Sequence, residues 1–291
     1  MKVVNNFLGK VESFLNSTNA NQKSIIYFRR AVYAMLFLKI LLLWPEIPTF
    51  YQHVLSRQEN YTGLALINHL IFLPFFQHSI YFTLSICMLF VAAGIFLRKH
   101  ILLAILIFII SINLMSLVYL ATNGGDLLLN LFVFSIIFLE EKKQTSEVKL
   151  MVSNSVWWIL KINLCFLYFI NGYGKIFKQI WFNGEVMQTV WQLDFYIHPH
   201  LVPSWFAHPI IAIVTAWTVI LFEFAFPFLI WFKAIKNYLI VIGIVFHLLI
   251  ALCLSLPDFG LTMIIAYIPF IDFENRFWRN KKKQPVLQAA H

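Results

Sequence analysis

The run ILLAILIFIISINLMSLVYL, residues 101–120, contains no charged residue over 20 consecutive positions. Because a helix needs ~20 apolar residues to cross the hydrocarbon core of a bilayer, this run predicts a membrane-spanning helix. Apolar segments on both sides of it predict seven more spans. We place these near residues 25–44, 80–97, 126–139, 153–173, 209–232, 238–256 and 260–272.

The composition of the whole chain supports the same class of protein. Hydrophobic residues make up 60% of the sequence, charged residues 12%, and the mean hydropathy is +0.77. A soluble domain of this length does not tolerate such values. The predicted fold is therefore an all-α integral membrane protein, a bundle of about eight transmembrane helices with interfacial amphipathic helices, multi-pass in a bacterial inner membrane.

No linker or repeat divides the chain, so the helices are predicted to form one transmembrane domain, residues 25–275. An amphipathic interfacial helix over residues 1–24 precedes it, and a basic tail over residues 276–291 follows. The long connections between spans are residues 45–79 and 174–208. Within the first, residues 64–76 are apolar but short, which favours a re-entrant or surface helix over a span.

Basic residues indicate the orientation of the bundle. Of the 22 Lys and Arg, 17 lie in the termini or in loops on one side of the predicted membrane. By the positive-inside rule this side, with both termini, is cytoplasmic. The net charge of +9 is dispersed over separate loops, so it predicts contact with anionic lipid of the bilayer rather than with nucleic acid.

The sequence favours neither a disulfide framework nor a metal centre. Its three cysteines, Cys87, Cys165 and Cys253, lie in apolar spans without a paired spacing. The segment His198-Pro199-His200 contains possible metal ligands, but no carboxylate or thiol follows at a recognisable spacing. No metal is expected.

Asn123-Gly124-Gly125-Asp126 lies at the predicted outer end of the third span. The glycines permit a tight turn, and Asp126 can cap the following helix. Capping alone explains the motif, and a second role of Asn123 and Asp126 in an outer-face site stays open.

The stretch YFINGYGK, residues 168–175, ends in a lysine at the outer end of a span, and Trp181 follows. An amine beside glycines and beneath aromatic cover is partly withdrawn from water, which disfavours the ammonium and suits a general base. Lys175 can equally be a lysine that snorkels to the interface, with Trp181 as a membrane anchor. On the first interpretation a cavity opens outward beside Lys175, Asn171, Tyr173 and Asp126.

Four polar residues are predicted to form a layer near the middle of the membrane. At ~1.5 Å per residue, their depth from the cytoplasmic helix ends is roughly 12–14 Å. Charged side chains at this depth face the bundle interior and pair with one another, so Glu223 is predicted to pair with Lys39 or His247. The layer either fixes helix register, or acts as a proton relay or as the floor of a cavity that opens outward toward Lys175. Its members are Lys39, Asn163, Glu223 and His247.

Several of these motifs together resemble vitamin K-dependent gamma-glutamyl carboxylase and its bacterial relatives, the horizontally transferred transmembrane (HTTM) family. The lysine-bearing stretch at residues 168–175 is similar to the family, as is the Gly124–Asp126 turn. The remaining similarities are Glu223 before Phe226-Pro227, the Phe246-His247 pair and the Phe259-Gly260 turn. They extend in order over most of residues 25–270.

The resemblance implies a function at the outer face. Lys175 would correspond to the lysine that deprotonates vitamin K hydroquinone, with Glu223 and His247 as further catalytic residues. A quinone is then the expected cofactor. Because the family includes a stand-alone membrane component for maturing a secreted peptide toxin, a secreted peptide and a small partner subunit are expected partners.

The competing hypothesis is a non-catalytic membrane protein. It would be either an accessory subunit or a transporter of lipid or small molecules that uses Lys39, Glu223 and His247.

Overall fold

The computed structural model describes residues 22–46, 49, 80–118, 122–141, 146–193, 197 and 204–273, and those residues fold into helices without a β-strand. Most of the predicted interfacial helix of residues 1–24, the segment 64–76, His198, His200 and the tail of residues 276–291 lie outside the described residues. The helices are α2 (Gln22–Leu43), α5 (Ile80–Phe96), α6 (Ile101–Leu117), α7 (Gly124–Phe138), α8 (Glu147–Ile176), α9 (Gln179–Phe182), α10 (Glu185–Val190), η2 (Ser204–Ala207), α11 (Pro209–Leu229), α12 (Lys236–Cys253), α13 (Pro257–Ile265) and η3 (Ile268–Phe270).

The prediction of an all-helical chain with apolar helices is confirmed. Within the part of the chain that the structure describes, three helices, α8, α11 and α12, are long and apolar enough to cross a membrane. Shorter apolar helices occupy four of the other predicted spans, at Tyr81–Phe96, Ile101–Leu117, Gly124–Phe138 and Pro257–Phe270. The total of eight spans and the cytoplasmic location of the termini stay predictions.

Large apolar side chains cover the outside of the bundle. Phe82, Leu89, Phe96 and Leu102 are each between 67% and 78% exposed, although they belong to apolar helices. In water such a surface would promote association, whereas hydrocarbon solvates it at no cost. The exposed surface thus agrees with a membrane environment.

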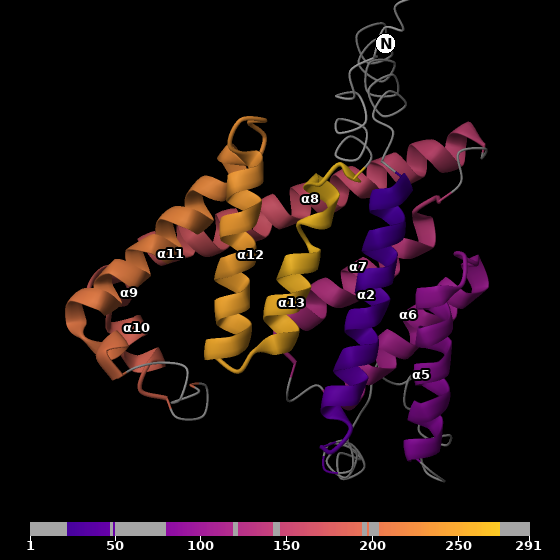
Figure 1. Ribbon diagram of the computed structural model, residues 1–291, viewed down its shortest axis with the longest axis horizontal. Coiled ribbons are helices and arrows are strands. Elements are labelled where there is room, and N and C mark those ends of the chain that lie inside the picture. Colours follow the sequence, from indigo (N-terminus) through magenta and orange to yellow (C-terminus); the bar gives the residue numbers. More distant parts are fainter. Residues whose placement is uncertain are drawn as a thin grey trace, which may run out of the picture.

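The helices form two groups that meet at α13, and α8 runs across both (Figure 1). In the first group α2 packs on α5, and α6 packs on α7. In the second group α12 packs on α13. Helix α13 also contacts α2 and α7 of the first group. Helix α8 starts in the first group and runs obliquely behind α2 and α13 to the second, where α11 lies along it (Figure 1). At 30 residues α8 is longer than the predicted span of residues 153–173, because its helix begins before the apolar run.

The start of α7 confirms the predicted cap. Asn123 Oδ1 accepts a hydrogen bond from the Gly125 amide at 2.7 Å, and Asp126 Oδ2 accepts one from the Asn123 amide at 2.8 Å. This reciprocal capping box satisfies amide groups that a helix start otherwise leaves unpaired.

The contact between α8 and α11 depends on Gly172. A Cβ atom at this position would lie 2.7 Å from the backbone nitrogen of Phe224 and 3.0 Å from the carbonyl carbon of Glu223. Backbone atoms of α11 cannot yield as the end of a side chain can. The absence of a side chain at Gly172 therefore sets how closely the two helices approach.

We expect Gly172→Ala to destabilise the folded protein by about 1–3 kcal/mol, because the added methyl group overpacks the interface between α8 and α11. The matched control is Gly174→Ala on the same helix, where a Cβ would meet no atom within 4 Å. Thermal unfolding of both variants in detergent measures the difference. Equal melting temperatures would contradict this description of the helix contact.

Candidate functional site

Lys175 points into the bundle and not out to the membrane interface. Its ammonium group forms an ion pair with the Glu223 carboxylate of α11, and the two side chains are 16% and 11% exposed. The Trp181 ring of α9 covers the same ammonium, with Nζ 4.8 Å from the ring centre. The sequence predicted the aromatic cover but not the carboxylate beneath it.

The local sequence explains why this pair forms. Lys175 follows Gly172 by three residues, so it lies on the face of α8 that Gly172 brings against Glu223 and Phe224. An ammonium at this point on the helix can therefore reach the carboxylate directly. Sequence analysis singled out both residues but could not place α11 beside α8.

A glycine also positions the aromatic cover. Gly184, between α9 and α10, has φ of +77°, in the left-handed region that favours glycine. A Cβ here would lie 2.7 Å from the backbone nitrogen of Ile213 in α11. The α9–α10 turn therefore packs tightly on α11 and holds Trp181 over Lys175.

Pro227 removes one backbone hydrogen bond of α11 next to the ion pair of Lys175 and Glu223. It lies inside the helix, four residues after Glu223, and has no amide hydrogen. The carbonyl group of Glu223 consequently lacks its usual i to i−4 donor. Glu223 thus contributes an acceptor from its backbone next to its carboxylate, a polar feature that the Phe226-Pro227 motif indicated only indirectly.

A second buried group of polar side chains lies about two turns before Lys175 in α8. Tyr168 Oη is 2.7 Å from His247 Nε2 of α12 and also hydrogen-bonds the Tyr267 hydroxyl. All three residues are at most 3% exposed. The Tyr168 ring packs against Phe222 and Phe226, which lie on either side of Glu223 in α11. This group, defined as the tyrosine–histidine cluster, therefore adjoins the ion pair inside the bundle.

The predicted pairing of Glu223 with Lys39 or His247 is wrong. Glu223 pairs with Lys175, and His247 bonds Tyr168. Lys39 instead forms an ion pair with Asp126 and lies 3.3 Å from an oxygen of Asp258. The reason is the close approach of α8 to α11 at Gly172, which brings Lys175 to the Glu223 carboxylate, whereas the His247 imidazole of α12 is directed at Tyr168.

Lys39, Asn123, Asp126 and Asp258 form a separate cluster where α2, α7 and α13 meet. Asn123 Nδ2 donates to Asp258 Oδ2 at 2.8 Å, the same oxygen that faces Lys39. Asp126 accepts from the Asn123 amide with one oxygen and from Lys39 with the other, so it both caps α7 and joins two helices. Sequence analysis missed Asp258, although its place in the first turn of α13 parallels that of Asp126 in α7.

The remaining predicted site residues lie apart from these contacts. Asn171 is exposed, and its amide donates to the Leu167 carbonyl of its own helix. Tyr173 is 49% exposed and stacks on Phe169. Asn163 has a buried Oδ1 without a hydrogen-bond partner. Asn171 and Tyr173 thus contact neighbouring residues of α8 rather than the pair of Lys175 and Glu223.

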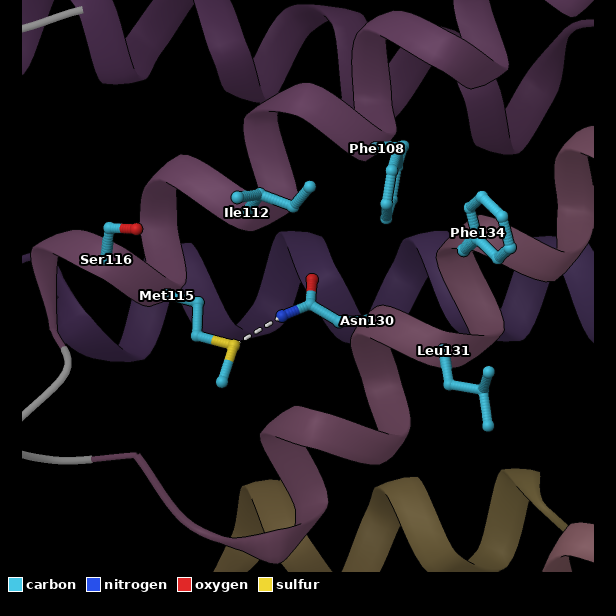
Figure 2. Close-up of a pocket in the computed structure, with 7 residues that line it drawn as sticks. All are labelled: Phe108, Ile112, Met115, Ser116, Asn130, Leu131 and Phe134. Carbon is cyan, nitrogen blue, oxygen red and sulfur yellow. Dashed lines mark hydrogen bonds between the residues drawn. The ribbon is translucent and has the colours of Figure 1, made fainter. Parts of the chain in front are cut away.

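A groove of about 480 Å³ opens between α6 and α7 and shares no residue with the ion pair. Its lining is mostly apolar, and Figure 2 shows the Asn130 amide directed at the Met115 sulfur from within it. The lining residues are Phe108, Ile112, Met115, Ser116, Asn130, Leu131 and Phe134. The groove adds apolar area to the lipid-facing surface, and none of its lining residues is titratable.

Comparisons with protein-family models, with curated proteins and with solved structures found no match for this chain.

The pair of Lys175 and Glu223 yields a double-mutant prediction. Lys175→Met leaves a mostly buried carboxylate without its partner and should lower the free energy of unfolding by about 3 kcal/mol. Adding Glu223→Gln to Lys175→Met should restore most of the loss, because the uncompensated charge is removed. Unfolding of the single and double variants in detergent measures the coupling, and strictly additive losses would show that the two side chains do not interact.

Proposed function

We propose that this protein is a membrane-embedded enzyme in which Lys175 acts as a base on a substrate at the outer end of α8. The observation that carries the proposal is the inward ammonium of Lys175, held between the Glu223 carboxylate and the Trp181 ring. A lysine that merely anchors a helix extends toward water. A lysine used as a base needs a partner that can take its proton.

The ion pair of Lys175 and Glu223 can produce a neutral amine by moving one proton from one side chain to the other. The total number of protons on the two side chains then stays the same. In a dry site an ammonium and a carboxylate are both costly, so the proton of Lys175 can pass to Glu223 and leave a neutral amine next to a neutral acid. The amine then accepts a proton from an acidic X–H group of the substrate. The products are the substrate anion and the lysine ammonium, which the anion and the Trp181 ring both stabilise.

The adjoining tyrosine–histidine cluster offers a route for the proton that Glu223 receives. Hydroxyl and imidazole groups both donate and accept hydrogen bonds, and Tyr168 links His247 to Tyr267. In this proposal His247 serves as a relay that resets the pair, not as a group that touches substrate.

The substrate class follows from the resemblance to the carboxylase-like HTTM family. A lipophilic quinol has weakly acidic hydroxyl groups and reaches the site from the bilayer, and its oxygenation by O2 would yield the strong base needed to modify a secreted peptide at the outer face. Lys175 would remove the hydroxyl proton of the quinol. A quinone cofactor, a peptide substrate and a small partner subunit belong to this proposal.

The alternative is a transporter or accessory subunit that uses the buried charges without chemistry. The observation that favours it is the cluster of Lys39 with Asp126 and Asp258, in which two carboxylates share one ammonium. In that case exchange of Lys175 for another cation should be tolerated, whereas changes at Glu223 or His247 should impair function.

We expect Lys175→Arg to reduce modification of the peptide at least 100-fold, because arginine keeps the positive charge but does not give up its proton. The matched control is Lys178→Arg, an exposed lysine in the connection from α8 to α9. Mass spectrometry of secreted peptides from cells with wild-type protein, with each variant and without the protein measures the product.

Two results would contradict the proposal. Identical peptide masses with and without the protein would exclude peptide modification. Full activity of Lys175→Arg, together with loss of function in Glu223→Gln, would remove Lys175 as the base and favour the transporter.

A further inference from the structure

A small hollow lies at the basic end of the bundle, where α2 meets the turn between α5 and α6. Its lining includes Arg29, Tyr33, Gly94, Arg98, Lys99 and His100, and its cavity volume is about 10 Å³. It shares no residue with the ion pair of Lys175 and Glu223 or with the Lys39 cluster. We refer to it as the basic hollow.

Positive charge exceeds negative charge around the basic hollow. Arg29 is paired with Glu141 and donates to the Gly94 carbonyl. Lys99 donates to the Ile137 carbonyl at 2.8 Å and lies 3.8 Å from Glu140, and its partial burial lowers its pKa. Arg98 is exposed at the mouth and forms no ion pair among the described residues. One cation therefore stays available for an external anion.

The start of α6 adds backbone donors at the same place. This 17-residue helix begins at Ile101, and the side chain of its N-cap residue, His100, makes no capping hydrogen bond. Leu103 and Ala104 of its first turn line the hollow. The first amide groups of a helix have no partner within it, and together with the helix dipole they favour a bound anion.

A buried hydroxyl group faces the basic hollow. Tyr33 lines the hollow, is 2% exposed, and its hydroxyl has no hydrogen-bond partner among the residues that the structure describes. Buried polar groups are rarely left unpaired, because the loss of water costs free energy that a partner has to offset. The inner part of the hollow has room for about one water, which can link this hydroxyl to an anion at the mouth.

The surroundings of the mouth favour a lipid over a soluble anion. Phe96 and Leu97 at the end of α5, and Ile101 and Leu102 at the start of α6, are between 55% and 78% exposed. These apolar side chains flank the charged mouth on both helices. A ligand that places a phosphate at Arg98 can therefore lay its acyl chains on them.

From these features we propose that the basic hollow binds the phosphate group of an anionic phospholipid. Arg98 and the amide groups at the start of α6 hold the phosphate at the mouth, Arg29 and Lys99 supply positive charge from the walls, and the Tyr33 hydroxyl bonds it through a water. Basic pockets between transmembrane helices are known to hold anionic headgroups by such contacts. The site would fix the packing of α2 against α5 and α6.

The test uses the full-length protein in detergent and native mass spectrometry with added phosphatidylglycerol or phosphatidylcholine. Arg98→Gln should weaken phosphatidylglycerol binding about tenfold, because it removes the one unpaired cation at the mouth. The matched control Lys233→Gln removes an exposed lysine from the turn between α11 and α12 and should leave binding unchanged. Phosphatidylcholine should bind all variants alike.

Tyr33→Phe separates a bound ligand from simple packing. Without anionic lipid it should not lower the melting temperature, because the hydroxyl has no partner to lose. With phosphatidylglycerol it should reduce binding severalfold. If this variant unfolds in phosphatidylcholine, the comparison of Arg98→Gln with Lys233→Gln decides alone.

The outcomes are distinct. Equal phosphatidylglycerol affinity of Arg98→Gln and Lys233→Gln would overturn the site. Displacement of phosphatidylglycerol by millimolar inorganic phosphate would show that a soluble anion is the ligand and would overturn the lipid assignment. Neither result depends on the chemistry of Lys175.

Discussion

The neutralisation of buried charges constrains how the helices of this protein are arranged. Lys39, Lys175 and Arg29 each leave water for the interior of the bundle, and each forms an ion pair with an acidic residue from another part of the chain. An unpaired charge there would cost several kcal/mol. The ion pairs therefore specify which helices meet, while the apolar side chains around them supply contact area without much preference for a partner.

The three ion pairs differ in what they can do. Arg29 and Glu141 join segments at the basic end of the bundle, where two carbonyl groups and further cations surround them. Lys39 joins α2 to α7 and α13 and is held by two carboxylates. Lys175 has one carboxylate and an aromatic ring, and its partner Glu223 lies on the stretch of α11 that packs against Tyr168 of the tyrosine–histidine cluster. The surroundings of Lys175 thus suit proton transfer better than those of the other two.

Much of the fold could be predicted because a membrane helix is recognisable from the hydrophobicity of its own residues. Apolar runs correctly placed α5, α6, α7, α11 and α12, and the Asn123–Asp126 motif correctly predicted the cap of α7. The burial of Lys39, Glu223 and His247 followed from their depth in apolar runs. Asp258 was missed because it lies in the first turn of the short helix α13, where an acidic residue is common and needs no partner from another helix.

The sequence by itself determined the all-helical class, the position of most helices and the polar residues that had to be buried. These depend on the hydrophobicity and spacing of residues close together in the chain. Only the tertiary structure decided that Glu223 pairs with Lys175, that His247 bonds Tyr168, and that Lys39 lies between Asp126 and Asp258. Such pairings depend on which helices are neighbours, and that is decided by close approaches such as Gly172 against α11, which join residues far apart in the sequence.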